Sequence, residues 1–547
     1  GYAALGSAAT TASYLTAVGR NALRYNTSGS SNVAVGYNTL EDNTTGSNGV
    51  AIGSGALAQN TTGASNTGVG KSALTLNTTG TRNTGLGHNV LAANTEGNYN
   101  VAAGYTALDS NTTGSSNVAI GDSALTANTT ANNNTSIGYA SFQANTTGTG
   151  NTGVGLQVGK GNTTGSQNTY LGINAGYGNT TANNNTGLGS EALFASTTGA
   201  QNTAVGRLAL RRNTTATGNT AVGYNSAAFT TTGAANTALG MESLYSNTTA
   251  SNNTAMGHKA LKFNTTGAQN TAVGTNALTA NTTASSNTVM GYNAGDNITT
   301  SPSNTIMGQN AGTNITTGNG ENVLIGNRAG VNMSTGAQNV IIGDNAGASL
   351  TTPVQNTFLD DNSGDAVTTG SHNTILGRFN GYQGGLDIRT TNNNIVLSDG
   401  AGNPRLHIDS NGVVSNPGVI AWRVKRTSGD VGANTDVVFN LVQVSQGGGY
   451  STSTGRFTAP VAGIYFISFT GRANGTSATH MSFKKNGTEF QGFRSTSTGG
   501  TVGNVGMAAS CVVDLAVNDY IQVRVKDGTM NGNEGLDDGM FSGYFIG

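Results

Sequence analysis

Pairs of acidic residues that could perform general acid–base catalysis are rare in this sequence. The adjacent pairs considered for such a role are Asp360–Asp361 and Asp537–Asp538. Neighbouring residues of an extended strand point to opposite faces, whereas glycoside hydrolysis requires two carboxyl groups that converge on one bond. The five histidines also lack metal-ligand spacing to one another, to Cys511 or to a carboxylate. We therefore expect no catalytic site and no enzymatic activity.

The candidates for metal ligands are acidic residues close to the end of the sequence. Asp527, Asp537 and Asp538, together with Glu534, could supply oxygen ligands to Ca²⁺. The segment lacks the spacing of an EF-hand loop, however. Calcium is the one metal that these oxygen ligands lead us to consider, and we expect no other cofactor.

The charge content argues against nucleic-acid and membrane partners. Only 9% of the residues are charged, and 24 Lys and Arg stand against 25 Asp and Glu. Neutralising phosphates requires a concentrated basic surface, and the sequence contains no basic stripe. No apolar run approaches the length of a membrane span. The single cysteine excludes internal disulfides, and because the sequence starts at Gly1, no signal or anchor segment can be read from it.

The elements that must position any site are dominated by one repeated phrase, such as "NTTGSSNVAIG" at residues 111–121. The glycine that closes each phrase, called here the anchor, recurs from Gly19 to Gly308 without a slip, since 308 − 19 = 289 = 17 × 17. Four further anchor positions extend the series to 22 units, ending at Gly377. A fixed period of this length is typical of a solenoid, in which each unit buries its inner face against its neighbours.

The residue types within each unit predict which side chains face the core and which face outward. Thr or Val stands three residues before every anchor, and an apolar residue such as Ile120 stands one before it. The alternation indicates a short strand, and we expect the apolar residue before the anchor to face the core. We expect two short strands and two tight turns per unit. Repeated Asn and Thr should form ladders of side-chain hydrogen bonds along the stack.

The repeat changes its pattern near residue 285. The Leu four residues after the anchor becomes Gly from Gly295 onward, and a hydrophobe such as Ile298 appears seven after the anchor. The residue two before the anchor grows at the same point, from Ala or Gly to Val289 and Ile306. We expect the cross-section of the solenoid to change here. Gly159 and Gly176 are early exceptions that the sequence does not explain.

The "NTT" phrase also fits the acceptor motif for N-glycosylation, for example at Asn43. A stacked turn explains every copy, so we prefer the structural interpretation and leave glycosylation open.

The repeated phrases resemble two groups of fibrous proteins. "VAIG" units are similar to those in the heads of YadA-like trimeric adhesins, and the "NTAVGYNAL…NTTG" type resembles bacteriophage tail fibres and related bacterial surface proteins. The resemblance covers residues 1–381 and implies a parallel β-roll with three chains side by side. The adhesin repeat is usually shorter than 17 residues, so the coil shape does not carry over.

After residue 382 the sequence changes character. Residues 382–417 read as a β-hairpin connector, with turn signals at "DGAGNP" and "DSNG". Residues 418–547 contain longer alternating segments such as "IAWRVKR", which predict a β-sandwich or jelly roll with Trp422 in its core. The overall expectation is an all-β protein, a parallel β-solenoid shaft followed by a sandwich.

The segment "GGGYSTSTGRFTAPVAGIYFISFTG" at 447–471 resembles the complement C1q-like domain of the tumour-necrosis-factor-like jelly-roll superfamily. This resemblance implies trimerisation around a threefold axis and ligand binding through loops, which are where binding residues concentrate on a rigid scaffold. Receptor-binding candidates in and beside these loops are Arg472, Asn474, His480, Arg494, Gly532 and Glu534.

The combined expectation is a non-enzymatic homotrimeric fibre that binds a host-surface glycan or protein through residues 418–547. A phage or phage-like tail fibre on the virion surface is the first interpretation. A bacterial extracellular adhesin or surface filament subunit is the alternative, and a solenoid depolymerase is disfavoured because no acidic cluster converges. The receptor itself cannot be read from the sequence.

Overall fold

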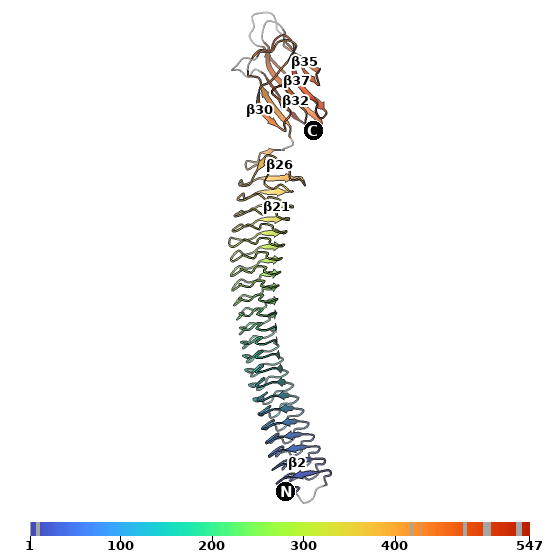
Figure 1. Cartoon of the computed structure of the whole chain (residues 1–547), viewed down its shortest axis with the longest axis vertical. Coiled ribbons are helices and arrows are strands. Elements are labelled where there is room, and N and C mark those ends of the chain that lie inside the picture. Colours follow the sequence, from blue (N-terminus) through green and yellow to red (C-terminus); the bar gives the residue numbers. More distant parts are fainter. Residues whose placement is uncertain are drawn as a thin grey trace. The chain divides into compact units, whose positions relative to one another are not determined.

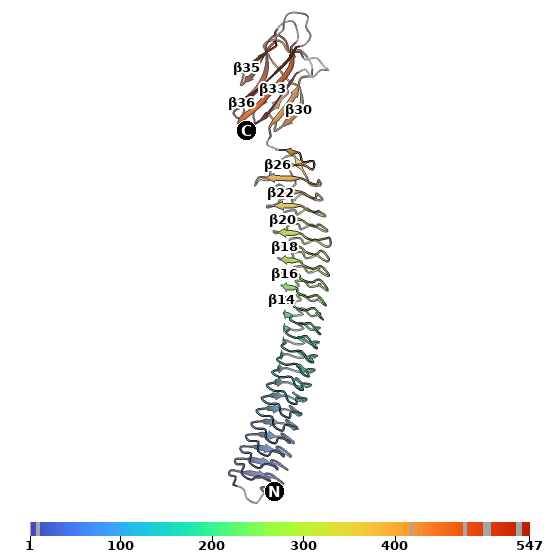
Figure 2. The ribbon, with the colours of Figure 1, turned by 180° about the vertical axis from the view of Figure 1, so that it is seen from behind.

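The computed structural model describes residues 2–6, 11–415, 419–427, 429–473, 478–495, 505–531 and 539–546. The fold is all-β: a parallel β-solenoid of 17-residue coils is followed by a β-sandwich (Figures 1 and 2). The chain divides into two compact units, and each is described by itself below. No helix in the described part of the chain could span a membrane.

Each coil of the solenoid, called here the shaft, contributes one strand of three residues that ends at the residue before the anchor. These strands are β1 (Thr16–Val18), β2 (Val33–Val35), β3 (Val50–Ile52), β4 (Thr67–Val69), β5 (Thr84–Leu86), β6 (Val101–Ala103), β7 (Val118–Ile120), β8 (Thr135–Ile137), β9 (Thr152–Val154), β10 (Thr169–Leu171), β11 (Thr186–Leu188), β12 (Thr203–Val205), β13 (Thr220–Val222), β14 (Thr237–Leu239), β15 (Thr254–Met256), β16 (Thr271–Val273), β17 (Thr288–Met290), β18 (Thr305–Met307), β19 (Val323–Ile325), β20 (Val340–Ile342), β21 (Thr357–Leu359) and β22 (Thr374–Leu376).

From β1 to β21 every strand pairs in parallel with the next, and equivalent residues lie opposite one another, as Val118 and Thr135 do. The 18-residue step between β18 and β19 keeps this register, because Thr305 still lies opposite Val323. The stack therefore forms one long parallel sheet along the shaft, as the sequence period predicts.

The expected direction of the strand side chains is wrong by one residue. Ala119, the middle residue of β7, is fully buried, whereas Ile120 before the anchor is 40% exposed. The same pattern recurs along the stack, where the middle residue is buried and its two neighbours are not. A three-residue strand can turn only one side chain inward, and the Leu from the following turn takes the remaining core volume.

The expectation of two strands per coil is also wrong. After the anchor, residues two and four positions on adopt positive φ, for example Ser123 (58°) and Leu125 (52°). This left-handed conformation interrupts extended backbone, so a second strand cannot form. Backbone hydrogen bonds still join the turn to the next coil, as from Leu125 N to Ser141 O at 3.0 Å.

The anchor itself requires glycine in nearly every coil. Gly121 has φ 128°, and a Cβ there would lie 2.6 Å from the carbonyl oxygen of Gly138 in the next coil. Asp360 alone occupies this position with a side chain, at φ 126°. Glycine therefore recurs at the anchor because the backbones of neighbouring coils stack too closely there to admit a side chain.

The change near residue 285 is a redistribution of core volume, as the sequence indicates. A Cβ at Gly312 would lie 2.8 Å from Leu324 and 3.1 Å from both Ile306 and Ile315. All three side chains are fully buried. They occupy the space that Leu side chains fill in the earlier coils, so glycine must replace that Leu.

The same compensation explains the two early exceptions. A Cβ at Gly159 would lie 2.4 Å from the ring of Phe142, and one at Gly176 would lie 2.4 Å from the ring of Tyr170. Both rings are fully buried and lie 6.0 Å apart between centroids. Each glycine therefore makes room for an aromatic side chain of a preceding strand or turn.

Two columns of buried asparagine run through the shaft and form the predicted ladders. In the "NTT" column Asn111 Nδ2 donates to Asn94 Oδ1 at 2.8 Å and to the carbonyl of Gly114 at 2.9 Å. In the second column Asn117 N donates to Asn100 Oδ1 at 3.0 Å. Since the "NTT" asparagines are buried, as Asn43 is completely, the folded coil offers no access for N-glycosylation.

Beyond the shaft strands, a short hairpin and three further strands precede the sandwich. They are β23 (Tyr382–Gln383), β24 (Leu386–Asp387), β25 (Ile395–Ser398), β26 (Pro404–Ile408) and β27 (Val414–Ser415). β25 lies parallel to β22 and so adds one more strand to the stack, and β26 and β27 continue in antiparallel order.

The sandwich has two antiparallel sheets that pack face to face. Its strands are β28 (Ala421–Lys425), β29 (Thr435–Asp436), β30 (Leu441–Gln446), β31 (Tyr450–Ser451), β32 (Arg456–Thr458), β33 (Gly463–Ala473), β34 (His480–Lys485), β35 (Thr488–Arg494), β36 (Val505–Leu515), β37 (Tyr520–Asp527) and β38 (Met540–Phe545). One sheet has the order β30-β28-β38-β33-β36, and the other β31-β32-β37-β34-β35 with β29 paired to β37.

Aromatic residues fill the sandwich core. Trp422 is 1% exposed and stacks on Phe457 with ring centroids 3.5 Å apart, and it meets Phe541 edge-on. The two sheets are thereby fixed against each other, which confirms the predicted core position of Trp422 and gives the surface strands a rigid support.

Candidate functional site

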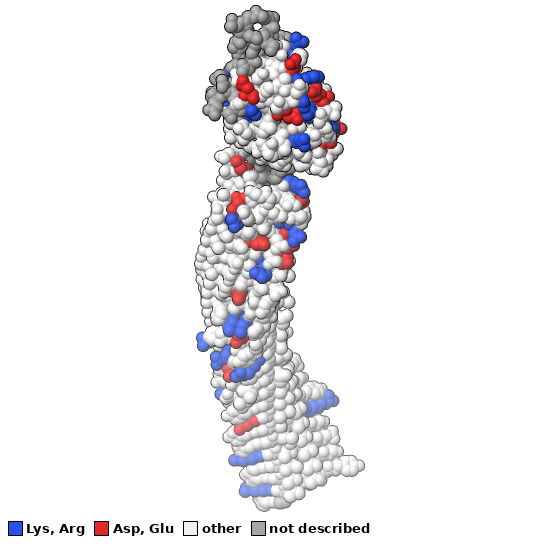
Figure 3. Space-filling model, turned by 45° about the horizontal axis from the view of Figure 1, so that its top comes forward, with Lys and Arg blue, Asp and Glu red and all other residues white. Residues whose placement is uncertain are grey.

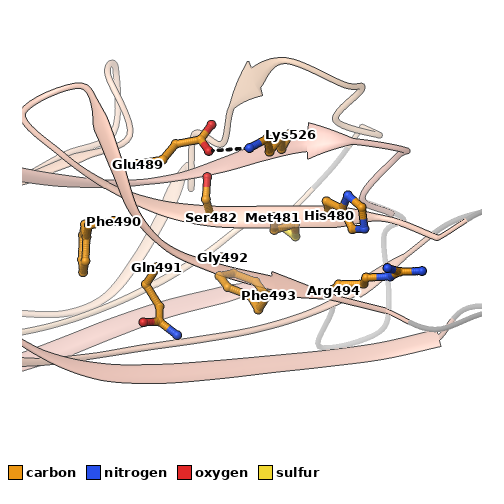
Figure 4. Close-up of a pocket in the computed structure, with 10 residues that line it drawn as sticks. All are labelled: His480, Met481, Ser482, Glu489, Phe490, Gln491, Gly492, Phe493, Arg494 and Lys526. Atoms are coloured by element: carbon orange, nitrogen blue, oxygen red, sulfur yellow. Dashed lines mark ion pairs between the residues drawn. The ribbon is translucent and has the colours of Figure 1, made fainter.

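The candidate site is a pocket on the sheet that ends in β35, called here the edge pocket. It has a volume of about 560 Å³ and is lined by His480, Met481, Ser482, Glu489, Phe490, Gln491, Gly492, Phe493, Arg494 and Lys526 (Figure 4). These residues come from the neighbouring strands β34, β35 and β37. The pocket therefore rests on paired strands and not on loops alone.

An ion triad holds these strands in place beside the pocket. Lys484 Nζ lies 3.0 Å from Asp436 Oδ1, and Arg524 Nη1 lies 3.3 Å from the same oxygen. The three residues belong to β34, β29 and β37, so the pairs connect three strands. Lys484 is nearly buried, so removing Asp436 would leave a buried charge without its partner and would destabilise the fold.

Two polar atoms beside the pocket are buried and lack a partner. Ser482 is 1% exposed, and its Oγ has no hydrogen-bond partner among the described residues. His480 Nε2 is likewise buried and unpaired within the described part of the chain. A buried polar atom without a partner costs about 1–3 kcal/mol, so such atoms are uncommon unless a ligand or water completes them.

Charged groups of both signs surround these atoms. Lys526 Nζ and Glu489 Oε2 form an ion pair of 3.1 Å on the side of the pocket to which Ser482 Oγ points (Figure 4). Arg494 lies opposite His480 in the β34–β35 pairing, and the two occupy the same end of the pocket. Arg494, Lys526 and Glu489 thus present two cations and a carboxylate at the surface of the pocket.

Apolar surface and free space complete the pocket. Phe490 is 42% exposed at the end opposite Arg494. A Cβ at Gly492 would meet only the carbonyl oxygen of Met481, at 3.9 Å. Glycine at this position therefore leaves open the space into which any larger side chain would project. An exposed ring at one end and hydrogen-bonding groups at the other suit a polar ligand with one apolar face, such as a sugar.

The structure places the predicted receptor-binding residues unequally. His480 and Arg494 line the edge pocket together. Arg472 belongs to β33 in the other sheet, where its carbonyl oxygen accepts a hydrogen bond from Asn531. The remaining candidates, Asn474, Gly532 and Glu534, lie outside the described residues. Their receptor-binding role stays a prediction.

The predicted calcium ligands are only partly visible. Asp527 lies opposite His480 in the β34–β37 pairing, and its side chain accepts a hydrogen bond from Gly528 N. Asp537 and Asp538 lie outside the described residues. Within the part of the chain that the structure describes, no three His, Cys, Asp or Glu side chains gather as they would around a metal ion.

The sequence analysis missed Ser482, Glu489 and Lys526. These three residues lie inside strands, whereas the candidates predicted from the sequence lie in or beside the predicted loops. The segment "FKKNGTE" supplies Glu489 and the turn between β34 and β35, but only strand pairing brings Lys526 within 3.1 Å of that carboxylate. Alternating polar residues on a predicted strand were the one available signal.

Comparisons with known proteins find similarity to part of this chain. The globular domain of zebrafish complement 1qA is 16% identical, with a TM-score of 0.20, and the match covers 23% of this chain and 98% of that one. For the Eiger TNF of S. frugiperda the values are 14% identity and a TM-score of 0.20, with 24% and 93% covered. No curated protein matches the chain. The family model described as C1q domain matches residues 421–546, the part of the chain that forms the sandwich, and these residues are called the C1q domain below.

Proposed function

We propose that this chain is the subunit of a non-enzymatic homotrimeric fibre whose C1q domain binds a host-surface ligand through the edge pocket. The observation that carries the proposal is Ser482, whose buried Oγ has no partner among the described residues and points toward the Glu489–Lys526 ion pair. The shaft repeats similar surfaces every 17 residues, whereas the edge pocket belongs to the non-repeating sandwich. Unique recognition therefore belongs to the C-terminal domain.

Exposed apolar residues on the outer face of the five-stranded sheet support self-association. Val512 is 59% exposed and Tyr544 is 49% exposed. Phe466 lies between them in the sheet, and its ring centroid is 5.2 Å from that of Tyr544. A continuous apolar surface of this kind is typical of a contact between subunits.

A second apolar surface runs along the shaft. The residue before the anchor is apolar in every coil, and many of these residues are more than a third exposed, such as Leu86, Ile120 and Leu239. They line the outer face of the parallel sheet at one residue per coil. A partner that covers this face must repeat at the same spacing, and another copy of the shaft does so.

The repeat phrases support a location outside the cell. Their resemblance to phage tail fibres favours a host-attachment fibre on a virion, with the shaft as a spacer and the C1q domain as the binding part. The "VAIG" phrases favour the second candidate, a bacterial surface adhesin. Both candidates place the same C1q domain against a surface glycan or protein.

Filling the edge pocket tests the binding role. Labelled full-length protein is applied to a printed glycan array, and the variant Gly492→Leu is compared with the native chain. Leu at position 492 projects into open space, so the fold should persist while bound glycans lose at least about tenfold in apparent affinity.

Gly432→Leu provides the matched control, because Gly432 is exposed, lies outside the edge pocket, and its added Cβ meets nothing within 4 Å. This variant should keep the native binding pattern. If Gly492→Leu keeps that pattern too, the ligand does not occupy the edge pocket. If the native protein binds no glycan, the glycan form of the proposal is wrong.

A further inference from the structure

The charge of the shaft is unevenly distributed along its length. Residues 123–295 contain six Lys or Arg and two Asp or Glu, so their net charge is 6 − 2 = +4. Residues 296–400 contain three Lys or Arg and eight Asp or Glu, so theirs is 3 − 8 = −5. Near-zero net charge of the whole chain conceals this separation, and Figure 3 shows basic groups gathered in the middle of the shaft.

Within the basic segment, three cations occupy the same position of their coils. Lys160, Arg211 and Lys262 each stand five residues after an anchor, and the two intervals are 211 − 160 = 51 and 262 − 211 = 51, or three coils each. With coils about 4.8 Å apart, the cations recur about every 14 Å along one edge of the shaft. The sequence shows no basic stripe because the stack alone aligns them.

Aromatic rings fill the intervals between these cations. Lys160 Nζ lies 5.9 Å from the ring centroid of Tyr177, which stacks on Phe194 at 5.2 Å, and Arg211 lies 5.6 Å from the Phe194 ring. The series is therefore cation, ring, ring, cation. All four side chains are partly exposed.

The arrangement repeats in the following coils. Arg212 lies 4.3 Å from the centroid of Phe229, whose ring meets Tyr245 edge-on at 4.8 Å. Lys262, in the coil after Tyr245, lies 5.1 Å from the ring of Phe263. We call the two series together the cation–ring ladder. Contact with rings restricts the long side chains before any ligand arrives, which lowers the entropy cost of binding an anion.

Two carboxylates accompany the ladder. Glu191 pairs with Arg211 at 2.7 Å, and Glu242 pairs with Lys262 at 2.8 Å. These ion pairs leave Lys160 and Arg212 without a carboxylate partner among the described residues. The ladder therefore combines uncompensated cations with hydrogen-bond acceptors that suit hydroxyl groups.

We propose that the cation–ring ladder is a second binding site, which takes an acidic polysaccharide lying along the shaft. Carboxylate or sulfate groups would meet the cations, and sugar hydroxyls would meet Glu191 and Glu242. The site lies on the turn after the strand, so it is separate from the apolar outer face of the sheet. It extends the proposed function, because an extended contact along the shaft would add to binding at the C1q domain.

The spacing of the ladder favours a polysaccharide over a nucleic acid. Each strand of a nucleic acid carries one phosphate about every 3.4 Å. This charge density far exceeds that of the ladder, which has one cation about every 14 Å. The two glutamates would also repel a dense row of phosphates. The rings face one another or a cation, so their faces are not free for base stacking.

Binding of the full-length protein to immobilised hyaluronate and to gellan, acidic polysaccharides with one carboxylate in each repeating unit of two and four sugars, tests the site, with neutral dextran as the blank. The native chain should bind at least one acidic polymer, and higher salt should weaken that binding. The triple variant Lys160→Gln/Arg211→Gln/Lys262→Gln should weaken it by roughly tenfold or more. Arg212→Gln, a single change at an exposed residue, should weaken it less, by about twofold to threefold.

Arg24→Gln is the matched control. Arg24 occupies the same coil position and lies 4.8 Å from the Tyr25 ring, but it lies outside the basic segment. This variant should bind like the native chain. Native-like binding by both the triple variant and Arg212→Gln, binding of neither polymer, or tighter binding of single-stranded DNA would overturn the proposal.

Gly492→Leu separates this site from the edge pocket. The variant should keep polymer binding, because the shaft is unchanged. If it abolishes that binding, the acidic polymer binds in the C1q domain, so the ladder is not a site while the proposed function stands.

Discussion

Single asparagines set the continuity of the ladder that runs inside the shaft. Where successive coils both carry the "NTT" asparagine, one donates to the other, as Asn128 does to Asn111 at 2.8 Å. Where the next coil lacks Asn, the acceptor is left over: Asn179 Oδ1 is buried and unpaired among the described residues, and the next coil carries Ser196. The same occurs at Asn213 and Asn281. Where the next coil lacks Asn, introducing one should add the missing hydrogen bonds and stabilise the stack.

Ser196→Asn should therefore stabilise the shaft. The new side chain would donate to Asn179 Oδ1 and accept from Asn213, which adds two buried hydrogen bonds worth about 1–2 kcal/mol together. Native-state hydrogen exchange of the full chain should show slower exchange in the coils around residue 196. Thr198→Asn, an exposed change two residues away, should have no such effect. Unchanged or faster exchange in Ser196→Asn would show that the ladder is not cooperative.

Core volume is also decided residue by residue. Gly159→Leu should destabilise its coil by about 3 kcal/mol, because the ring of Phe142 occupies the space. Leu adopts similar positive φ at this position in other coils, as Leu57 does at 53°. Backbone strain is therefore not the obstacle.

Phe142→Leu in the same chain should restore most of the lost protection, since two Leu would then stack as in the early coils. Hydrogen exchange of the two single variants and the double variant measures the coupling. Additive effects would contradict the volume argument.

At the scale of elements, the period and the cross-section could be predicted from the sequence, but the strand face could not. The 17-residue spacing and the switch at Gly295 and Ile298 follow from residue type alone, because core volume must be conserved. A three-residue strand gives no such signal. The hydrophobicity of Ile120 predicts a core position, yet the small Ala119 is the buried residue. Ile120 and its equivalents in other coils lie on the exposed face of the sheet.

The sandwich shows the same division. Trp422 and the aromatic residues around it could be assigned to the core, and His480 and Arg494 could be named as candidates from their proximity to loops. Ser482 could not, because its burial depends on Lys526 and Glu489, which β37 and β35 bring to β34. Contacts between distant segments have no signature in a single sequence.

At the scale of the whole molecule, the proposed homotrimer would cover apolar surface that a single chain leaves exposed. Apolar residues remain exposed both on the outer face of the C1q-domain sheet, such as Val512, and along the shaft, such as Leu239. A lone chain would leave both surfaces in water, at a cost of roughly 25 cal/mol for each Å² of apolar area. Association of identical copies removes both costs at once.

Sedimentation equilibrium of the full-length protein at micromolar concentration tests this claim most directly. A homotrimer predicts one species with three times the mass of the chain and no measurable monomer on dilution, because an interface that covers apolar surface of both the shaft and the C1q domain should bind tightly. A stable, folded species with the mass of a single chain would contradict it.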